Sequence, residues 1–431
     1  MGRARFNGGL RIVPLVFALG WAILLRPGEM PTSTGIAASE VRTLQFDDGT
    51  RAMAALRDLR SIEEIDWEME GESKRLPAPR FLAWGRRTTL RSRGAIVLSD
   101  GSVLATEEPF AFQPTNDANT VWPRDGIGSP ANWSRSKVLA VFARLPVDRD
   151  ERERVVIDAF ANGVQEEAIE LANGDRVVGQ WQEPVTDRGG DGPAANVRWK
   201  SRAGTIEIPW DRVRCLRFRT KLQSSADAQL IVGLNDGSKL VLRSVRREGD
   251  LIDLELVCGL RLRASAESLM DALVSIESLS KDRVFLSDLE PLSYKHVAYL
   301  SKSWPLGNDR TSLGTALHCC GGIVSKGLGM HSTSRVAYDV SAGYARFESL
   351  IGLDEYVGTT GSVLFRVFVD QGDGTWSAAY ESPIMRAGDK AVAVSIDISK
   401  AERIALIVDA ADRGDLQDHA NWLYARLVRQ P

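Results

Sequence analysis

The sequence has few residues of the kinds that build metal or redox centres. Its 431 residues include only four cysteines and four histidines. They form no Cys-x-x-Cys pair and no Cys/His spacing typical of zinc ligands, so we expect no zinc site. A disulfide between the neighbours Cys319 and Cys320 would be strained. Cys215 and Cys258 could be two core thiols or one disulfide, and their spacing leaves both open.

Sequence signatures of catalysis are absent as well. There is no Gly-x-Ser-x-Gly motif, no His-Glu-x-x-His motif and no Gly-rich phosphate loop after a strand. The acidic residues do not recur in a motif that would mark the two carboxylates of a glycoside hydrolase. We therefore predict that the protein is not an enzyme, and an unrecognised glycoside hydrolase is the least favoured alternative.

The charge pattern lacks a strongly basic or acidic region. The chain has 54 Lys and Arg residues against 57 Asp and Glu residues, a net charge of −3. No basic cluster stands apart from acidic neighbours, so we expect no nucleic-acid partner. A hydrophobic content of 44% is typical of a globular protein. The length predicts two to four domains.

Only the N-terminus contains a long apolar run. Arg3, Arg5 and Arg11 precede an apolar segment over residues 12–25, which Arg26 and Pro27 end. This order is typical of an export signal, and the run is short for a membrane span. Residues 1–38 are thus a signal peptide or a retained N-terminal anchor. We predict a secreted, periplasmic or cell-envelope protein, with membrane contact only if that segment is retained.

Residues 40–283 contain a loosely repeated phrase in which a strand-like run ends in Asp-Gly or Asn-Gly and another run follows. The four turns are Asp48-Gly49, Asp100-Gly101, Asn173-Gly174 and Asp236-Gly237. Such turns between alternating apolar residues indicate β-hairpins. The pattern predicts four divergent antiparallel β-meander units of roughly 50–70 residues, in one domain or several, a period compatible with small barrels or with stacked β units. The phrase is weakly similar to Sm-like barrels.

Other local signals in this region are weaker. Three of the turns are followed by an apolar residue and proline, at Leu76-Pro77, Leu145-Pro146 and Ile208-Pro209. Helical spacing predicts a helix over about 264–279 that Ser265 would cap, and a weaker one over Arg51–Ile65.

From residue 284 the pattern changes to longer strands between Gly- and Asp-rich loops. Strand-like runs cover residues 335–340, 345–351, 362–369, 391–397 and 403–408. Several strands with regular turns and little helix predict a β-sandwich. The fold class is therefore mainly β.

Residues 284–431 resemble the carbohydrate-binding module called NPCBM, known from family 98 glycoside hydrolases. The resemblance rests on Leu286-Ser-Asp288-Leu289, Lys326-Gly-Leu-Gly-Met-His331, the Gly352-Leu-Asp354 turn and the closing Asp418-His-Ala-Asn-Trp422. Cys319-Cys320 departs from the small or apolar residue usual before Gly. The resemblance implies a jelly roll of the galactose-binding type whose partner is a glycan or polysaccharide.

Sugar binding needs an aromatic face and a few neutral polar groups. Among the loop and strand-end residues of this module, we predict carbohydrate contacts by His331, Trp376, Asn308, Asp309 and Tyr380. His331 could equally be a buried, carbonyl-bonded histidine. Trp422, inside the closing motif, is expected in the core.

Modules of the type it resembles often hold a structural Ca²⁺ ion, and this one has many loop carboxylates. Hard oxygen ligands suit Ca²⁺. We name Asp288, Asp354 and Asp418 as candidate ligands. A solvated acidic loop without a metal is the alternative.

Together these observations predict a non-catalytic, exported carbohydrate-binding protein in which the β repeats serve as a scaffold. The main alternative is a structural or protein-interaction protein of the envelope whose module has lost sugar binding. In that case the exposed strand edges of the repeats would hold a protein partner.

Overall fold

The computed structural model describes residues 40–107, 114–115, 123–124, 127–128, 133–161, 163–182, 196–299, 301–412 and 414–429. Contacts group residues 36–431 into one compact unit. The predicted signal or anchor over residues 1–38 lies outside the described residues. In the described ranges, no helix has both the length and the apolar character needed to cross a membrane.

The region before the sandwich consists of four repeats. Repeat 1 contains β1 (Arg42–Gln45), β2 (Arg51–Leu59), β3 (Ile65–Met69), β4 (Glu72–Arg75) and β5 (Ala83–Gly85); repeat 2 contains β6 (Gly94–Leu98), β7 (Val103–Thr106) and β12 (Val138–Phe142). Repeat 3 contains β13 (Ala168–Leu171), β14 (Arg176–Gln182), β15 (Asn196–Ser201), β16 (Gly204–Pro209) and β17 (Val213–Arg217); repeat 4 contains β18 (Leu230–Leu234), β19 (Lys239–Glu248), β20 (Leu251–Leu256), β21 (Arg261–Ser265) and β22 (Leu273–Ser278). Two-residue strands pair between β7 and β12: β8 (Pro114–Thr115) with β11 (Trp133–Ser134), and β9 (Pro123–Arg124) with β10 (Ile127–Gly128).

All four repeats share one pairing scheme, in which the last strand returns to pair with the first. The central pairs are Leu44↔Trp84, Ile96↔Val141, Ile169↔Leu216 and Val232↔Ile276. Each first-strand residue of these pairs precedes its turn glycine by the same number of positions. The four turn glycines have φ between 82° and 93°, the left-handed region that a tight hairpin requires. The predicted hairpins are therefore present.

Among the described strands the repeats do not close into barrels. Instead, the last strands pair antiparallel with each other, β5 with β22 and β12 with β17. Repeat 1 is thus joined to repeat 4, and repeat 2 to repeat 3. One bridge, Lys239↔Val103, links β19 to β7. The last strand of each repeat thus makes its second set of backbone hydrogen bonds with another repeat and does not close its own barrel. The strands β4, β16 and β21 therefore have one described partner each.

The structure corrects several local expectations in this region. Residues 51–59 form β2 and not a helix, because this run is the second arm of the hairpin and pairs with both β1 and β3. The helix predicted over about 264–279 is present but shorter. Ser265 accepts a hydrogen bond from the Ser268 amide and begins α2 (Ala266–Ala272), after which the β-branched Val274 and Ile276 continue as β22.

Helix α1 (Arg149–Ala161) was not expected from the sequence. Its N-terminus is capped by Asp148, whose carboxylate accepts a hydrogen bond from the Glu151 amide at 2.8 Å. The Leu145-Pro146 step precedes this helix, whereas Leu76-Pro77 and Ile208-Pro209 each precede the short helical turn before a last strand. Cys215 and Cys258 are free thiols, so they form no disulfide.

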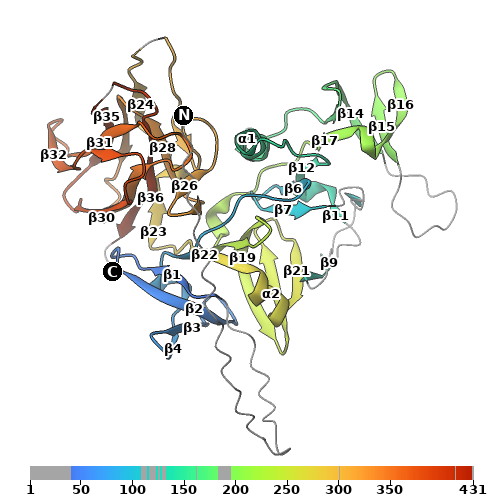
Figure 1. Ribbon diagram of the computed structural model, residues 1–431, viewed down its shortest axis with the longest axis horizontal. Coiled ribbons are helices and arrows are strands. Elements are labelled where there is room, and N and C mark those ends of the chain that lie inside the picture. The colour runs from blue at the N-terminus through green and yellow to red at the C-terminus, as the bar shows by residue number, and fades with distance from the viewer. Residues whose placement is uncertain are drawn as a thin grey trace, which may run out of the picture. The chain divides into compact units, whose positions relative to one another are not determined.

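The C-terminal region is a sandwich of two antiparallel sheets (Figure 1, orange to dark red). One sheet has the order β25 (Gly307–Asn308), β28 (Gly327–His331), β36 (His419–Arg429), β30 (Tyr344–Leu353) and β34 (Val392–Asp397), with β23 (Arg283–Phe285) also on β36. The other has the order β24 (Ser293–His296), β29 (Ser334–Asp339), β35 (Arg403–Ala410), β31 (Ser362–Asp370) and β32 (Trp376–Glu381), with β33 (Met385–Arg386) on β31. A separate hairpin consists of β26 (Leu317–Cys319) and β27 (Gly322–Val324). The predicted mainly β fold and the sandwich are confirmed.

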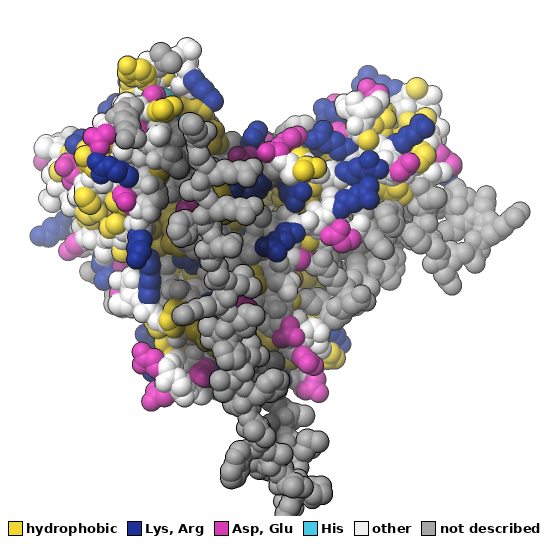
Figure 2. Space-filling view, viewed as in Figure 1, with side chains coloured by type: hydrophobic (Ala, Val, Ile, Leu, Met, Phe, Trp, Pro, Cys, Tyr) yellow, Lys and Arg dark blue, Asp and Glu magenta, His cyan; other side chains and the backbone are white. Residues whose placement is uncertain are grey.

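The core and the sequence motifs of the sandwich support each other. Trp422 is fully buried, with its ring 5.0 Å from that of Phe365, so it belongs to the core. The Lys326 ammonium binds Asp288 at 2.6 Å and Asp309 at 2.7 Å. These ion pairs join the opening motif to the Lys-Gly-x-Gly-x-His motif. On the face drawn in Figure 2, Lys and Arg side chains are interspersed with Asp and Glu.

Candidate functional site

Three of the four histidines meet at one end of the sandwich. His296 ends β24, His331 ends β28 and His419 begins β36. His331 and His419 are direct partners in the β28–β36 pair. The loop between β24 and β25 adds Trp304, whose backbone N–H donates to His296 Nδ1 at 3.3 Å. We call His296, His331, His419 and Trp304 the aromatic end cluster.

The rings of the aromatic end cluster are closely packed. The half-buried Trp304 ring stacks on His331 with centroids 4.8 Å apart and 15° between the planes. The Trp304 and His419 rings lie at 88°, 5.0 Å apart. The Lys302 ammonium lies 3.6 Å from the Trp304 centroid. Because His331 is buried and Lys302 is an exposed, flexible side chain, the Trp304 face that Lys302 covers is the one a ligand can reach.

His331 and His419 are neutral hydrogen-bonding groups at pH 7. Burial lowers the pKa of His331, and burial together with the neighbouring His331 lowers the pKa of His419 to about 4. A neutral imidazole has one donor and one acceptor nitrogen. Because His296 Nδ1 accepts a hydrogen bond, its proton resides on Nε2. That buried atom has no partner among the described residues.

Further polar atoms near this end lack a partner. Asn421 Oδ1 is buried and makes no hydrogen bond within the described part of the chain. Ser332 Oγ and Asp418 Oδ2 are buried without a well-aligned partner there, although the Ser332 hydroxyl lies close enough to lower the pKa of Asp418. In folded proteins such atoms are rare, and a ligand, an ion or water normally satisfies them. The end of the sandwich therefore combines an aromatic face with histidine, serine and amide groups and the Asp418 carboxylate, an arrangement that suits a polyhydroxylated ligand.

The structure brings only some of the predicted carbohydrate contacts to this end. His331 lies inside the aromatic end cluster. Asn308 is exposed on the edge strand β25, while Asp309 is engaged by Lys326 and by the Gly327 amide at 3.1 Å. Trp376 and Tyr380 lie on β32, at the far edge of the other sheet from β24. The pairs Asp370↔Trp376 and Asp370↔Arg403 place Trp376 at the opposite end of the sandwich.

The three predicted calcium ligands do not converge on one point. Asp288 is paired with Lys326. Asp354 accepts hydrogen bonds from the backbone of His318 and from the Asn421 amide at 3.0 and 2.9 Å. Asp418 accepts one from the Ser362 amide at 2.8 Å and keeps Oδ2 free. Over the described residues, no group of three or more His, Cys, Asp or Glu side chains has an arrangement that could hold a metal ion.

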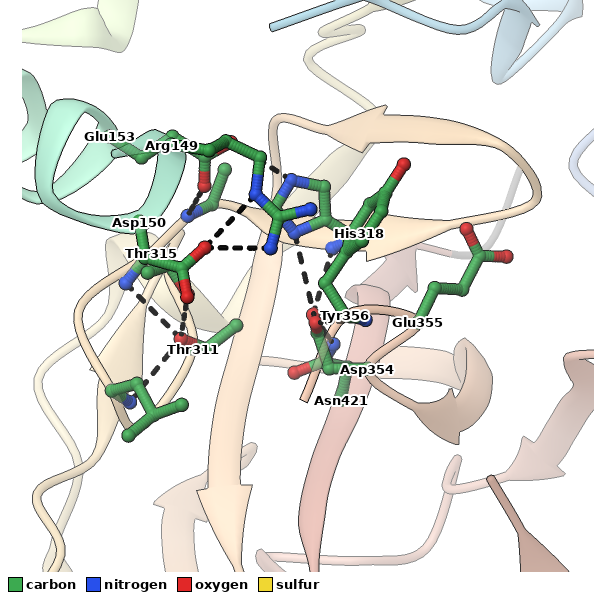
Figure 3. Close-up of polar contacts among 12 residues, drawn as sticks. Arg149, Asp150, Glu153, Thr311, Thr315, His318, Asp354, Glu355, Tyr356 and Asn421 are labelled. Atoms are coloured by element: carbon green, nitrogen blue, oxygen red, sulfur yellow. Dashed lines mark hydrogen bonds and ion pairs between the residues drawn. The ribbon is translucent and has the colours of Figure 1, made fainter. Parts of the chain in front are cut away.

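Helix α1 attaches the repeats to this same end of the sandwich (Figure 3). The Glu153 carboxylate lies 3.0 Å from His318 Nε2 and also accepts from the Ala316 amide at 3.0 Å. His318 Nδ1 faces Asp354 at 3.7 Å. Burial alone would lower the pKa of His318, but its bonds to Asp354 and Glu153 outweigh burial and raise it to about 9. A protonated His318 thus lies between two buried carboxylates. Beside them, the Arg149 guanidinium lies 3.8 Å from the Tyr356 ring centroid.

The turn between β26 and β27 presents an exposed free thiol. The sulfurs of Cys319 and Cys320 lie 2.6 Å apart, and Cys320 is exposed. The hydrogen bond between the two thiols lowers the pKa of Cys320 to about 6, whereas burial raises the pKa of Cys215 to about 12.

Cys320 is therefore expected to be alkylated by iodoacetamide at pH 7 well before Cys215 and Cys258. Timed alkylation followed by peptide mass spectrometry measures the order. Equal rates at all four cysteines would contradict this assignment.

Reasoning from the sequence missed His296, His419 and Trp304 as members of the site. The sequence could have indicated the two histidines, because each lies at the end of a strand in the module that resembles NPCBM. Trp304 did not differ from the other loop aromatics. The capping pair Asp148 and Glu151, followed by good helix formers, could have indicated α1.

Comparison with known families identifies the C-terminal module. Residues 282–428 match the NPCBM/NEW2 domain. The NPCBM resemblance is thereby confirmed for this part of the chain. The motif residues of this module hold it together. Lys326 pairs with Asp288, Asn421 bonds Asp354, and Trp422 lies in the core.

The chain is similar to a candidate bacterial glycosidase and to solved modules named CBM51, and it spans only a small part of the curated relative's length. A candidate endo-alpha-N-acetylgalactosaminidase of Renibacterium salmoninarum is 28% identical over 109 residues, which is 25% of this chain and 7% of that protein. The CBM51-2 and INT domains of Clostridium perfringens ZmpB are 26% identical, cover 42% of this chain and 37% of theirs, and have a TM-score of 0.31. The CBM51 of Clostridium perfringens GH95 in complex with methyl-galactose is 24% identical, covers 34% of this chain and 99% of its own, and has a TM-score of 0.30.

Proposed function

We propose that this protein binds a glycan through its NPCBM module, at the aromatic end cluster. The observation that carries the proposal is the half-exposed Trp304 ring, fixed against His331 and close to buried polar atoms that lack an aligned hydrogen-bond partner among the described residues. A sugar ring would stack its C–H face on Trp304, displacing Lys302. Its hydroxyls would bond His296 Nε2 and the neighbouring polar atoms.

We further propose that the protein is exported and acts without catalysis, with the repeats as a scaffold. The basic residues and the apolar run before residue 26 support export. Absence of turnover on chromogenic glycosides by the purified full chain is the expected result. Turnover that disappears on replacing a single acid would contradict the non-catalytic role.

A glycan array probed with the full chain tests the binding proposal. We expect specific binding to one class of glycan, competed by the free sugar. Absence of binding in both Ca²⁺ and chelator would contradict the proposal. It would favour the interaction-protein alternative instead, in which a protein partner adds to the one-sided strands β4, β16 and β21.

We also propose that Asp418 contributes to a structural calcium site near the aromatic end cluster. Its Oδ2 is buried without a well-aligned partner. Burial outweighs the hydrogen bonds from Ser362 and Ser332 and raises the pKa of Asp418 to about 6, and no cation is among the groups that act on it. A bound Ca²⁺ would supply that charge. Asp288 and Asp354 are already neutralised or hydrogen-bonded within the chain and fit this role less well.

Calcium is therefore expected to raise the melting temperature of the wild-type chain by a few degrees, and Asp418→Asn is expected to abolish the rise. Thermal unfolding in Ca²⁺ and in chelator measures both. Asp412→Asn is the matched control, because the Asp412 carboxylate already pairs with Arg386 at 2.6 Å. A calcium response that persists in Asp418→Asn would contradict the assignment.

A further inference from the structure

A row of directly paired residues crosses the sheet where repeats 1, 2 and 4 meet. Gly85 pairs with Ser275, Ser275 with Gly233, Gly233 with Lys239, and Lys239 with Val103. Direct cross-strand partners present their side chains on the same face of a sheet. The side chain of Lys239 therefore lies on the face from which a side chain at Gly233 would project.

Arg87 occupies the space above Gly233. A Cβ atom on Gly233 would lie 2.9 Å from Arg87 Cγ, so only glycine allows Arg87 to lie there. The NPCBM module also fixes the backbone of Arg87, because the Arg87 carbonyl accepts a hydrogen bond from the Ile323 amide at 2.9 Å. Arg87 and Lys239 thus lie over the same face, between repeat 4 and the NPCBM module.

These two cations have no counter-ion of their own. Within the described chain neither side chain forms an ion pair. Two of the carboxylates that act on them from a distance are paired with other cations, Glu153 with His318 and Asp309 with Lys326. Glu277 bonds the neutral Ser325 and shares its charge between Arg86 and Arg87, and Asp100 bonds the amides of Ser102 and Cys258. These two carboxylates act on the cations only from a distance, and with Arg86 included the cations still outnumber them. Burial lowers the pKa of Arg87, and burial together with the nearby Arg87 lowers the pKa of Lys239 to about 8.

Unused donors accompany the unpaired charge. Arg87 Nε and the hydroxyl of the next residue, Thr88, are buried and have no partner among the described residues. An enclosed cation without a counter-charge is costly, and so is an enclosed donor without an acceptor. One anion with several acceptor oxygens, bound between the Arg87 guanidinium and the Lys239 ammonium, would supply the missing charge and an acceptor for Arg87 Nε.

We propose that Arg87 and Lys239 form a binding site for a single oxyanion group, a phosphate, sulfate or carboxylate, separate from the aromatic end cluster. The guanidinium offers a planar pair of donors to two oxygens of such a group, and the Lys239 ammonium binds a third or shares one. The group can come from a free inorganic anion or from an acidic substituent on a larger ligand.

Thermal unfolding of the full chain with inorganic phosphate, against sodium chloride at matched ionic strength, tests the site. We expect a saturable rise of a few degrees in the wild-type melting temperature with phosphate. A comparison of galactose 6-sulfate with galactose tests the second source, an acidic substituent on a larger ligand. If such a substituent fits, the sulfated sugar should raise the melting temperature and galactose should not.

Lys239→Met and Arg87→Met remove the charges while keeping most of the side-chain volume. Both are expected to lose the phosphate-dependent rise. Without phosphate, Lys239→Met should melt at the wild-type temperature or above it, because an unpaired cation has been removed. Arg243→Met is the matched control from the same strand, since Arg243 is more exposed and pairs with Asp227 and Glu255, and it should keep the rise.

Calorimetric titration of phosphate into the folded chain at 20 °C gives a second readout that does not depend on melting behaviour. At least a tenfold loss of affinity in Lys239→Met is expected. Phosphate affinity equal to wild type in both variants, or no phosphate response in the wild type beyond that of chloride, would overturn the proposal.

Discussion

Replacing Trp304 with alanine is expected to reduce the affinity for the glycan at least tenfold. The Trp304 ring supplies the only large flat surface in the aromatic end cluster, and His331 holds it in place. Losing an aromatic stacking surface and its buried area costs about 1.5–3 kcal/mol, which corresponds to a dissociation constant weaker by roughly tenfold to 150-fold. Calorimetric titration of the full-length variant with the glycan selected on the array measures this loss.

Trp376→Ala provides a matched control for this prediction. Trp376 is 38% exposed and lies under the Arg403 guanidinium at the opposite end of the sandwich. Its replacement should leave glycan affinity within twofold of wild type. If Trp376→Ala loses binding and Trp304→Ala does not, the glycan site lies at that other end. Equal melting temperatures of the two variants would show that neither effect comes from unfolding.

Replacing Glu153 with alanine is expected to lower the free energy of unfolding by about 3 kcal/mol. The variant leaves the buried His318 with one carboxylate in place of two and leaves the Ala316 amide without its acceptor. Denaturant unfolding measures the loss. Glu151→Ala on the same helix is the control, because Glu151 pairs at the surface with Arg214 at 3.2 Å and should cost less than about 1 kcal/mol. Equal losses in the two variants would contradict a special role for Glu153.

The same contact predicts a pH dependence with a defined sign. The pKa of His318 is raised from 6.5 to about 9 on folding, so the protonated form is favoured in the folded state. Its contribution is fully present below pH 6.5 and is lost as the pH rises to 9. The shift corresponds to about 3 kcal/mol. His318→Asn should remove this slope, measured as the wild-type minus variant difference between pH 6.5 and 9. A difference that does not change with pH would contradict the prediction.

Much of the local structure follows from the sequence because its signals are local. Asp-Gly and Asn-Gly turns set the four hairpins, since only residues tolerant of positive φ fit there. Period-two alternation and Gly-rich loops indicate the strands of the sandwich. The motifs around Lys326 and Trp422 are specific enough to identify the NPCBM module. The failures, such as residues 51–59, occur where strand pairing overrides local propensity.

The tertiary structure alone decided which distant groups meet. The last strands of the repeats pair with one another instead of closing barrels, because an open strand edge is satisfied by whichever edge the fold brings to it. The same holds for the candidate sites. Glu153 and His318 are 165 residues apart, and the aromatic end cluster draws on the ends of three strands and a loop. No spacing along the chain encodes these contacts, because side-chain periodicity reports the face of a strand and not the strand that lies beside it.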